Sequence, residues 1–146
     1  MFAPVRVSRG ERVCAAVLAT LALGVLIIAW RLVPDPSGTG THQQLGLPAC
    51  GWLVASGYPC PTCGMTTAFA AAAHARPWTA FVSQPLGALL ALGTAVFFWA
   101  SLHVAVFGSQ LGRVGGRLLS GRVLWACFGV FAAAWAYKIL QVRQGW

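Results

Sequence analysis

Acidic side chains are almost missing from this sequence. Its 146 residues include only two carboxylates, Glu11 and Asp35, against ten Lys and Arg. Enzymes that work through a pair of carboxylates are therefore nearly excluded, because the topology predicted below puts these two residues on opposite sides of a membrane. Proton-coupled transport normally places acidic residues within the spans, and none are found there. No motif links a serine, a histidine and an aspartate as in a hydrolase.

Several other features are absent. The chain has no internal repeat, heptad array, glycine-rich phosphate loop or long low-complexity tract. Its basic residues do not form a stripe with aromatic residues between them, so we expect no nucleic-acid partner. They gather instead before the first apolar run and between the second and the third, at Arg6, Arg9, Arg12, Arg113, Arg117 and Arg122. Membrane proteins place their cations in this way.

Apolar residues dominate what is present, at 58% of the chain, while charged residues make up only 8%. Three runs are long enough to cross the hydrocarbon layer as helices, at about residues 13–33, 86–107 and 123–140. The sequence therefore predicts an all-α integral membrane bundle, formed as a single membrane domain over residues 1–146. The first run exceeds the length of about 7 to 15 residues usual for a signal peptide, and no clear cleavage site follows it, so we expect a retained anchor.

The distribution of arginine predicts the orientation of the spans. Cytoplasmic loops retain Lys and Arg, whereas the long connection at about residues 34–85 carries only Arg76. We therefore expect a cytoplasmic amino terminus and an extracytoplasmic connection. The same topology puts Lys138 and Arg143 outside, which mildly disagrees with the positive-inside rule. The side of the carboxyl terminus therefore stays open.

The connection at 34–85 begins with a stretch rich in Pro, Gly, Ser and Thr that suits a loop. An alanine-rich stretch then predicts a short helix from about Pro61 to His74, because Pro is favourable at a first helical position. This helix is too short to span, so we expect it at the outer membrane surface or as a re-entrant segment. The stretch "RPWTAFVSQP" is expected to form a turn. Small residues within the second and third spans predict close packing of those helices, at Gly87, Ala91, Ala95, Gly129 and Ala133.

Two cysteines separated by two residues, Cys60 and Cys63, mark the start of the predicted short helix. Pro61 would put Cys60 at the amino terminus of that helix, where free N–H groups and the helix dipole favour a thiolate. The same spacing suits a disulfide in an oxidising compartment. Cys50 is a third cysteine on the same predicted side of the membrane.

Four interpretations of these cysteines are open. The first is a disulfide or thiol packing that staples the long loop. The second is redox exchange, in which Cys60 reacts, Cys63 resolves and Cys50 shuttles electrons, although the strand–helix–strand context of a redox C-x-x-C is missing. The third is zinc held by the three cysteines with His42 or His74. The fourth is a contact site for a partner protein.

The remaining cysteines and histidines have simpler interpretations. Cys14 and Cys127 are expected to be small apolar packing residues. His103 lies inside a span, where an ionisable group is a functional candidate, yet it is close to the cytoplasmic boundary and a hydrogen bond to a neighbouring helix would explain it equally well. His74 could simply stabilise the carbonyl end of the short helix.

The block "CPTCGMTTAF", followed by a histidine and by "QPLGALLAL" at the start of a span, resembles the small bacterial membrane proteins grouped as domain-of-unknown-function family 2752. The resemblance covers about residues 57–98. It implies a multi-pass protein of the bacterial plasma membrane and brings no established activity. The matching positions are Cys60, Pro61, Cys63, Gly64, Thr66, Ala68, Phe69, His74 and Pro85.

Three positions depart from the pattern of that family. Thr67 stands where the family usually has Arg, Ala75 where it has Gly, and Gln84 where it has Asn. Without this Arg, any role that needs a cation beside the cysteines has less support, because threonine donates a hydrogen bond but brings no charge.

These observations predict a non-enzymatic accessory or assembly component in which the cysteine motif is a structural staple and no cofactor is needed. The expected partners are the lipid bilayer and either another membrane protein or a second copy of the chain. There are two rival hypotheses. One is a membrane thiol-disulfide oxidoreductase of the quinone-coupled type, which usually has more spans and a second cysteine pair. The other is a metal-binding membrane protein.

Overall fold

The computed structural model of the chain describes residues 7–109 and 121–144. Within these ranges the regular structure is helical and contains no strand, which confirms the all-α fold class. Three helices are long and apolar enough to cross a membrane, in the three runs where spans were expected: α1 (Arg9–Arg31), α5 (Pro85–Phe107) and α7 (Gly121–Gln144). At a rise of about 1.5 Å per residue, each covers more than the hydrocarbon thickness of about 30 Å.

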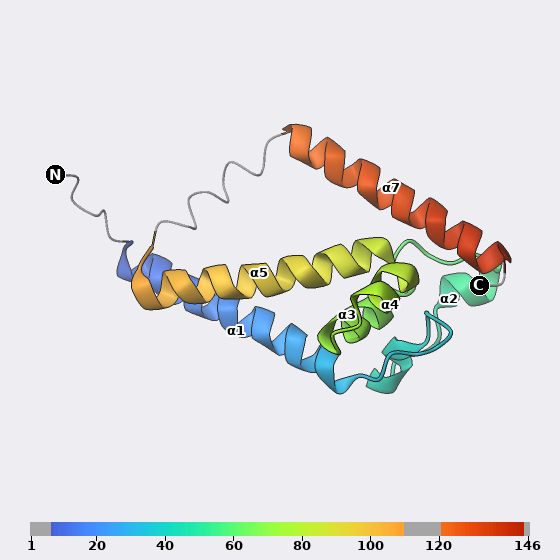
Figure 1. Cartoon of the computed structure of the whole chain (residues 1–146), viewed down its shortest axis with the longest axis horizontal. Coiled ribbons are helices and arrows are strands. Elements are labelled where there is room, and N and C mark those ends of the chain that lie inside the picture. Colours follow the sequence, from blue (N-terminus) through green and yellow to red (C-terminus); the bar gives the residue numbers. More distant parts are fainter. Residues whose placement is uncertain (1–6, 110–120, 145–146) are drawn as a thin grey trace.

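Helices α1 and α5 lie side by side and antiparallel (Figure 1). At one end of the pair, the guanidinium of Arg12 donates hydrogen bonds to the carbonyl oxygens of Ala105 and Val106, at 3.0 and 2.9 Å. The buried residues of α1 are all alanines, which lets the two helix backbones approach closely. They are Ala15, Ala19, Ala22 and Ala29.

The connection between α1 and α5 folds into four short helical elements at the opposite end of this pair (Figure 1). They are η1 (Thr41–Leu45), α2 (Gly51–Ser56), α3 (Met65–Ala73) and α4 (Pro77–Ser83). The short helix expected from Pro61 begins only at Met65, because Gly64 is its N-cap and has a left-handed φ of +87°. The turn expected at "RPWTAFVSQP" is instead helix α4, with Pro77 in its first turn, where proline is tolerated.

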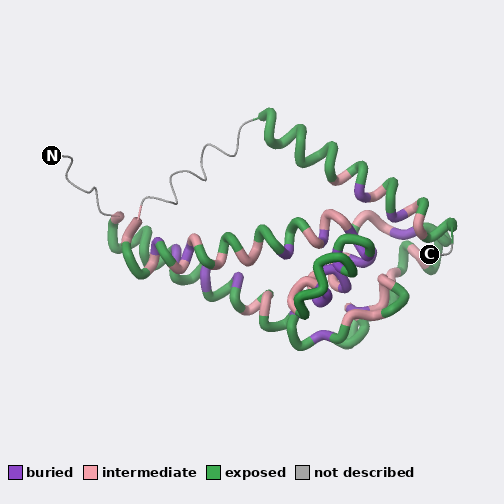
Figure 2. Tube along the Cα trace, viewed as in Figure 1, coloured by how far each residue is buried: buried purple, intermediate pink, exposed green. Residues whose placement is uncertain are grey.

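A small alanine core forms where α3 and α4 meet (Figure 2), with Ala68, Ala71 and Ala80 almost fully buried. Helix α5 packs against it through Gly87, where an added Cβ would lie only 2.8 Å from the Cβ of Ala68. Gly87 and Ala91 are both buried. The close contact at Gly87 is with α3 and not with another long helix.

Helix α7 lies apart from α5 over most of its length. Its carboxyl-terminal end approaches the α1–α5 connection (Figure 1). Its buried residues are Ala134 and Lys138. Gly129 and Ala133 are exposed, so the prediction that the third span packs through these residues is wrong. The contacts of α7 are made instead by long polar and aromatic side chains near its carboxyl-terminal end.

Candidate thiol and metal site

Three cysteines converge where the α1–α5 connection is folded. Cys50 is the N-cap of α2, and Cys60 and Cys63 lie just before α3. The three sulfur atoms are all within 4.8 Å of one another. Cys63 is buried, whereas Cys50 and Cys60 are half-buried. We refer to these three residues as the thiol cluster.

Local backbone geometry brings Cys60 and Cys63 together. The N–H of Cys63 donates to the carbonyl oxygen of Cys60 at 3.0 Å, and the N–H of Met65 donates to Thr62 at 3.1 Å. This tight turn precedes α3, so Cys60 does not lie at a helix amino terminus as the sequence suggested. A helix dipole therefore does not explain the properties of Cys60.

The expected disulfide finds no support in this structure. The sulfur atoms of Cys60 and Cys63 are 3.3 Å apart, whereas a disulfide bond needs about 2.05 Å. All five cysteines of the chain are free thiols. The cluster is therefore a group of three adjacent thiols.

The two cysteines of the turn differ in acidity. Burial pushes the pKa of Cys60 upward, but hydrogen bonds from Thr62, Cys63 and Cys50 outweigh burial and leave the pKa of Cys60 below its ordinary value. Burial, together with the hydrogen bonds to Cys60 and Cys50, raises the pKa of Cys63 to about 12. The first thiolate to form in the turn is therefore that of Cys60.

Two part-buried hydrogen bonds fix the backbone around Cys60. The indole Nε1 of Trp135 on α7 donates to the carbonyl oxygen of Pro59 at 3.1 Å. The amide Nε2 of Gln84 donates to the carbonyl oxygen of Pro61 at 2.9 Å. Gln84 is fully buried, and its Oε1 accepts no hydrogen bond within the described ranges. Side chains from α7 and from the start of α5 therefore hold the residues on both sides of Cys60.

Thr67, at the position where the resemblance led us to expect arginine, has a structural partner. Its hydroxyl lies 2.9 Å from that of Thr41, and both residues are buried. The hydroxyl of Thr41 also accepts a hydrogen bond from the N–H of Asp35 at 2.9 Å. These bonds tie the first part of the connection to α3.

Lys138 of α7 supplies a cation near the thiol cluster that the sequence analysis did not assign to the site. Its side chain is only 1% exposed, and its ammonium donates to the carbonyl oxygen of Ser83 at 2.8 Å. An added Cβ on Gly64, the residue after Cys63, would lie 3.1 Å from this Nζ. A lysine inside an otherwise apolar run was the signal for such a role, because ionisable groups in spans are functional candidates.

The two histidines considered as zinc ligands lie outside the thiol cluster. His74 follows the carboxyl-terminal end of α3, while the cysteines precede its amino-terminal end, and its Nδ1 hydrogen-bonds the carbonyl oxygen of Ala70 at 2.9 Å. The Nε2 of His42 hydrogen-bonds the carbonyl oxygen of Pro48 at 3.1 Å. The group of residues that could hold a metal therefore consists of the three thiols.

Other candidate residues are separate from this site. Cys14 on α1 and Cys127 on α7 are exposed on these apolar helices. His103 is exposed near the end of α5, and its Nδ1 hydrogen-bonds the hydroxyl of Ser109 at 2.9 Å, just beyond its own helix. Pro85 forms the first turn of α5.

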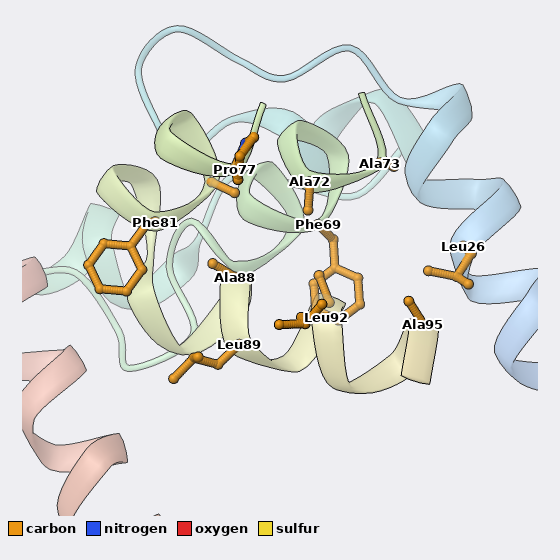
Figure 3. Close-up of a pocket in the computed structure, with 12 residues that line it drawn as sticks. Leu26, Phe69, Ala72, Ala73, Pro77, Phe81, Ala88, Leu89, Leu92 and Ala95 are labelled. Atoms are coloured by element: carbon orange, nitrogen blue, oxygen red, sulfur yellow. The ribbon is translucent and has the colours of Figure 1, made fainter. Parts of the chain in front are cut away.

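Phe69, a residue of the resemblance motif, lines an apolar groove of about 410 Å³ that extends over α1, α3, α4 and α5 (Figure 3). Leu92 of α5 lies beside Phe69, and Phe81 of α4 lines the groove farther along (Figure 3). Phe69 and Thr66 also line a second hollow against α1. Neither lining contains a cysteine, a histidine or a charged side chain, so we assign the grooves no chemistry.

Comparisons with known proteins bear on about a third of the chain. No curated protein and no solved structure matches it. Residues 50–99, which contain all three clustered cysteines, α3, α4 and the first part of α5, match the family described as "Protein of unknown function (DUF2752)", which confirms the resemblance expected from the sequence.

Proposed function

We propose that this protein is a non-enzymatic membrane component whose thiol cluster binds a thiophilic metal ion and thereby fixes the α1–α5 connection. The observation that carries this proposal is the position of Cys50. It precedes Cys60 by ten residues and is separated from it by helix α2, yet its sulfur lies beside those of Cys60 and Cys63. A dithiol staple or redox pair needs only two sulfurs. A zinc site needs at least three protein ligands, and copper(I) also accepts three thiolates.

The spacing of the sulfur atoms supports the same proposal. Thiolates bound to one zinc ion at about 2.3 Å in tetrahedral directions lie about 3.8 Å apart. The Cys60 and Cys63 sulfurs are 3.3 Å apart, and no pair in the cluster exceeds 4.8 Å. Shifts of about an ångström would therefore bring all three onto one ion, with the fourth zinc position left for water or a partner.

A metal ion would take the role that the sequence analysis gave to a disulfide. It would join the start of α2 to the turn before α3, which are otherwise linked only through α2 and residues 57–59. Binding energy at such a site adds directly to folding stability, because the unfolded chain does not hold the ligands together. The cluster would therefore act as a staple that is removed by chelators.

We also propose that the thiol cluster lies on the extracytoplasmic side and that the amino terminus is cytoplasmic, in a bacterial plasma membrane. The support is that Arg9 and Arg12 lie at the end of the α1–α5 pair opposite to the cluster, as positive-inside placement requires (Figure 1). Arg6, Arg113 and Arg117, which contributed to the prediction, lie outside the described residues. Reporter fusions after Gly46 and at the amino terminus test this topology, and a cytosolic reporter at Gly46 would contradict it.

The experiment that tests metal binding uses the full chain purified in detergent under reducing conditions. After loading with Zn²⁺ or copper(I) and removal of excess, wild-type protein is expected to retain about one equivalent. Single substitutions Cys50→Ser, Cys60→Ser and Cys63→Ser are expected to lower this stoichiometry and the melting temperature of the loaded protein.

Matched controls are available in the same chain. Cys14→Ser and Cys127→Ser alter exposed cysteines on the long helices and should leave metal content unchanged. A wild-type protein that takes up neither ion would contradict the proposal. So would a Cys50→Ser variant that binds metal as tightly as the wild type.

A second candidate function, thiol-disulfide exchange, is favoured by the 3.3 Å approach of Cys60 and Cys63 and by the greater accessibility of Cys60. In this reaction the Cys60 thiolate attacks a disulfide of a partner protein, and one partner thiol leaves. Cys63 then attacks the mixed disulfide and releases the second partner thiol, so the pair is oxidised and the partner is reduced. A membrane quinol or another dithiol must return two electrons to the pair.

Mass-tagging of free thiols in native membranes across a series of redox buffers separates the two functions. A Cys60–Cys63 pair that titrates near the redox poise of the compartment favours exchange. Thiols that are protected from tagging until a chelator is added favour the metal site. Co-purification would show whether another membrane protein or a second copy of the chain binds, as the sequence analysis expects.

A further inference from the structure

Lys138 is a buried cation whose hydrogen-bond partners, among residues 7–109 and 121–144, are all neutral. Its ammonium donates to the carbonyl oxygens of Ser83 at 2.8 Å and Gly38 at 3.4 Å, and to the side-chain Oε1 of Gln141 at 3.0 Å. These three acceptors match the three donors of an ammonium group. They satisfy its hydrogen bonds but do not neutralise its charge.

No carboxylate balances this charge within the part of the chain that the structure describes. The sequence has only two acidic side chains, and Glu11 lies in the first turn of α1, at the far end of the α1–α5 pair. Asp35 lies on the same connection as Gly38, and its Oδ1 accepts a hydrogen bond from the N–H of Ser37 at 2.8 Å. Burial of an ion without an opposite charge is strongly unfavourable, so an anionic group is expected beside Lys138.

The thiol cluster would provide that anionic group once its sulfurs bind a metal ion as thiolates. Cys63 of the cluster directly precedes Gly64, the residue that lies against the Lys138 ammonium. The backbone is tightly packed between Cys63 and Lys138. A Cβ added to Gly64 would lie 2.6 Å from the carbonyl oxygen of Gly38 and 3.0 Å from that of Ser83. It would also lie 3.1 Å from the Lys138 Nζ. The carbonyl groups that hold the ammonium are thus packed directly against the residue that follows Cys63.

We propose that Lys138 is the counter-cation of the metal–thiolate complex, and that its single charge makes a divalent thiophilic ion the preferred occupant. Three thiolates and a divalent ion carry one net negative charge, which Lys138 neutralises. The same thiolates with copper(I) carry two, which leaves one negative charge uncompensated in a buried site. This inference rests on the metal site proposed above and names the class of ion that it takes.

The test measures zinc affinity of the full chain in detergent by competition with a chromophoric chelator. Lys138→Met keeps the length and apolar stem of the side chain but removes its charge, and we expect zinc affinity to fall by about tenfold or more, as for other groups outside the ligands themselves. Lys138→Arg keeps the charge and should retain more affinity than Lys138→Met. The preference for zinc over copper(I), measured as a ratio of affinities in the same proteins, should be greatest in the wild type.

The matched control is Tyr137→Phe. Tyr137 also joins α7 to the connection, since its hydroxyl donates to the carbonyl oxygen of Val82 at 3.2 Å, but it is not one of the hydrogen-bond partners given above for Lys138. This variant loosens α7 without changing the charge or the acceptors that hold it, and it should weaken zinc binding by less than about threefold. Equal losses in Lys138→Met and Tyr137→Phe would show that Lys138 only positions α7, and would overturn the inference.

Two further outcomes are distinguishable. If Lys138→Met does not fold, the comparison between Lys138→Arg and Tyr137→Phe decides the matter. An arginine variant that binds zinc more weakly than the phenylalanine variant overturns the inference. If wild-type protein and Lys138→Met bind zinc equally well, the metal site remains supported and the role of Lys138 is overturned. Wild-type protein that takes up no zinc overturns both the metal site and this inference.

Discussion

The indole nitrogen of Trp135 lies 3.1 Å from the carbonyl oxygen of Pro59, the residue before Cys60. Pro59 is buried, so this hydrogen bond joins the third long helix to the backbone of the thiol cluster. Trp135→Phe keeps an aromatic ring but removes the donor and leaves the carbonyl group buried without this partner. We expect the free energy of unfolding to fall by about 1 to 3 kcal/mol, measured by denaturant melting in detergent.

Trp125→Phe is the control for this prediction. Trp125 lies near the other end of the same helix, is 76% exposed, and makes an edge contact with the ring of Phe128. Its replacement should change the free energy of unfolding by no more than about 0.5 kcal/mol. Equal melting curves for the two variants would show that the Trp135–Pro59 hydrogen bond does not hold α7 in place.

Gly64→Ala is expected to destabilise the protein for two separate reasons. The residue has a φ of +87°, which strains any side chain, and its new Cβ would lie 2.6 Å from the carbonyl oxygen of Gly38. Gly57→Ala isolates the first reason, because Gly57 has a φ of +70° and no atom within 4 Å of an added Cβ.

We expect Gly57→Ala to lower the free energy of unfolding by about 1 kcal/mol and Gly64→Ala by about 1 to 3 kcal/mol more. Thermal melting of both variants in one detergent checks the difference. If Gly64→Ala costs no more than Gly57→Ala, the carbonyl groups around Lys138 are not packed as described.

Gly87→Ala is expected to push α5 away from α3, because its Cβ would lie 2.8 Å from that of Ala68. Overpacking of this kind costs about 1 to 3 kcal/mol. The same substitution at Gly93, in the same helix but with no atom within 4 Å, should stabilise the protein by about 0.5 to 1 kcal/mol. Opposite shifts in melting temperature are therefore the expected result, and shifts of the same sign would contradict the packing of α3 on α5.

Alkylation should distinguish the two cysteines of the turn in reduced, metal-free protein. Only the thiolate reacts, and the pKa of Cys60 is lowered while that of Cys63 is raised to about 12. As pH rises from about 6 to about 9, Cys60 should therefore gain reactivity first, while Cys63 stays protonated and unreactive. Peptide mass spectrometry after timed alkylation measures both rates.

The same measurement in SDS serves as the control, because the difference between the cysteines depends on the folded structure. There the two rates should converge. A Cys63 that reacts as fast as Cys60 in the folded, metal-free protein would contradict the burial and hydrogen bonding described for the turn.

The three long helices could be predicted because each depends on a property of its own segment. Lipid selects a stretch that is apolar and long enough to cross it, and α1, α5 and α7 meet that condition whatever their neighbours are. The short elements could not be located as well. Helix α4 was expected to be a turn, and α3 begins four residues later than expected because Gly64 adopts a left-handed conformation that packing imposes.

The amino-acid sequence by itself determined the membrane class and the Cys60–Cys63 pair, since both follow from residues that are close along the chain. Only the tertiary structure decided that Cys50 joins the pair, that His74 does not, and that Lys138 brings a cation to the site. The physical reason is distance along the chain: Lys138 follows Cys63 by 75 residues, and no local preference of the backbone determines where α7 returns. That position is set by hydrogen bonds from α7 to carbonyl groups of the α1–α5 connection, which form only when the whole chain is folded.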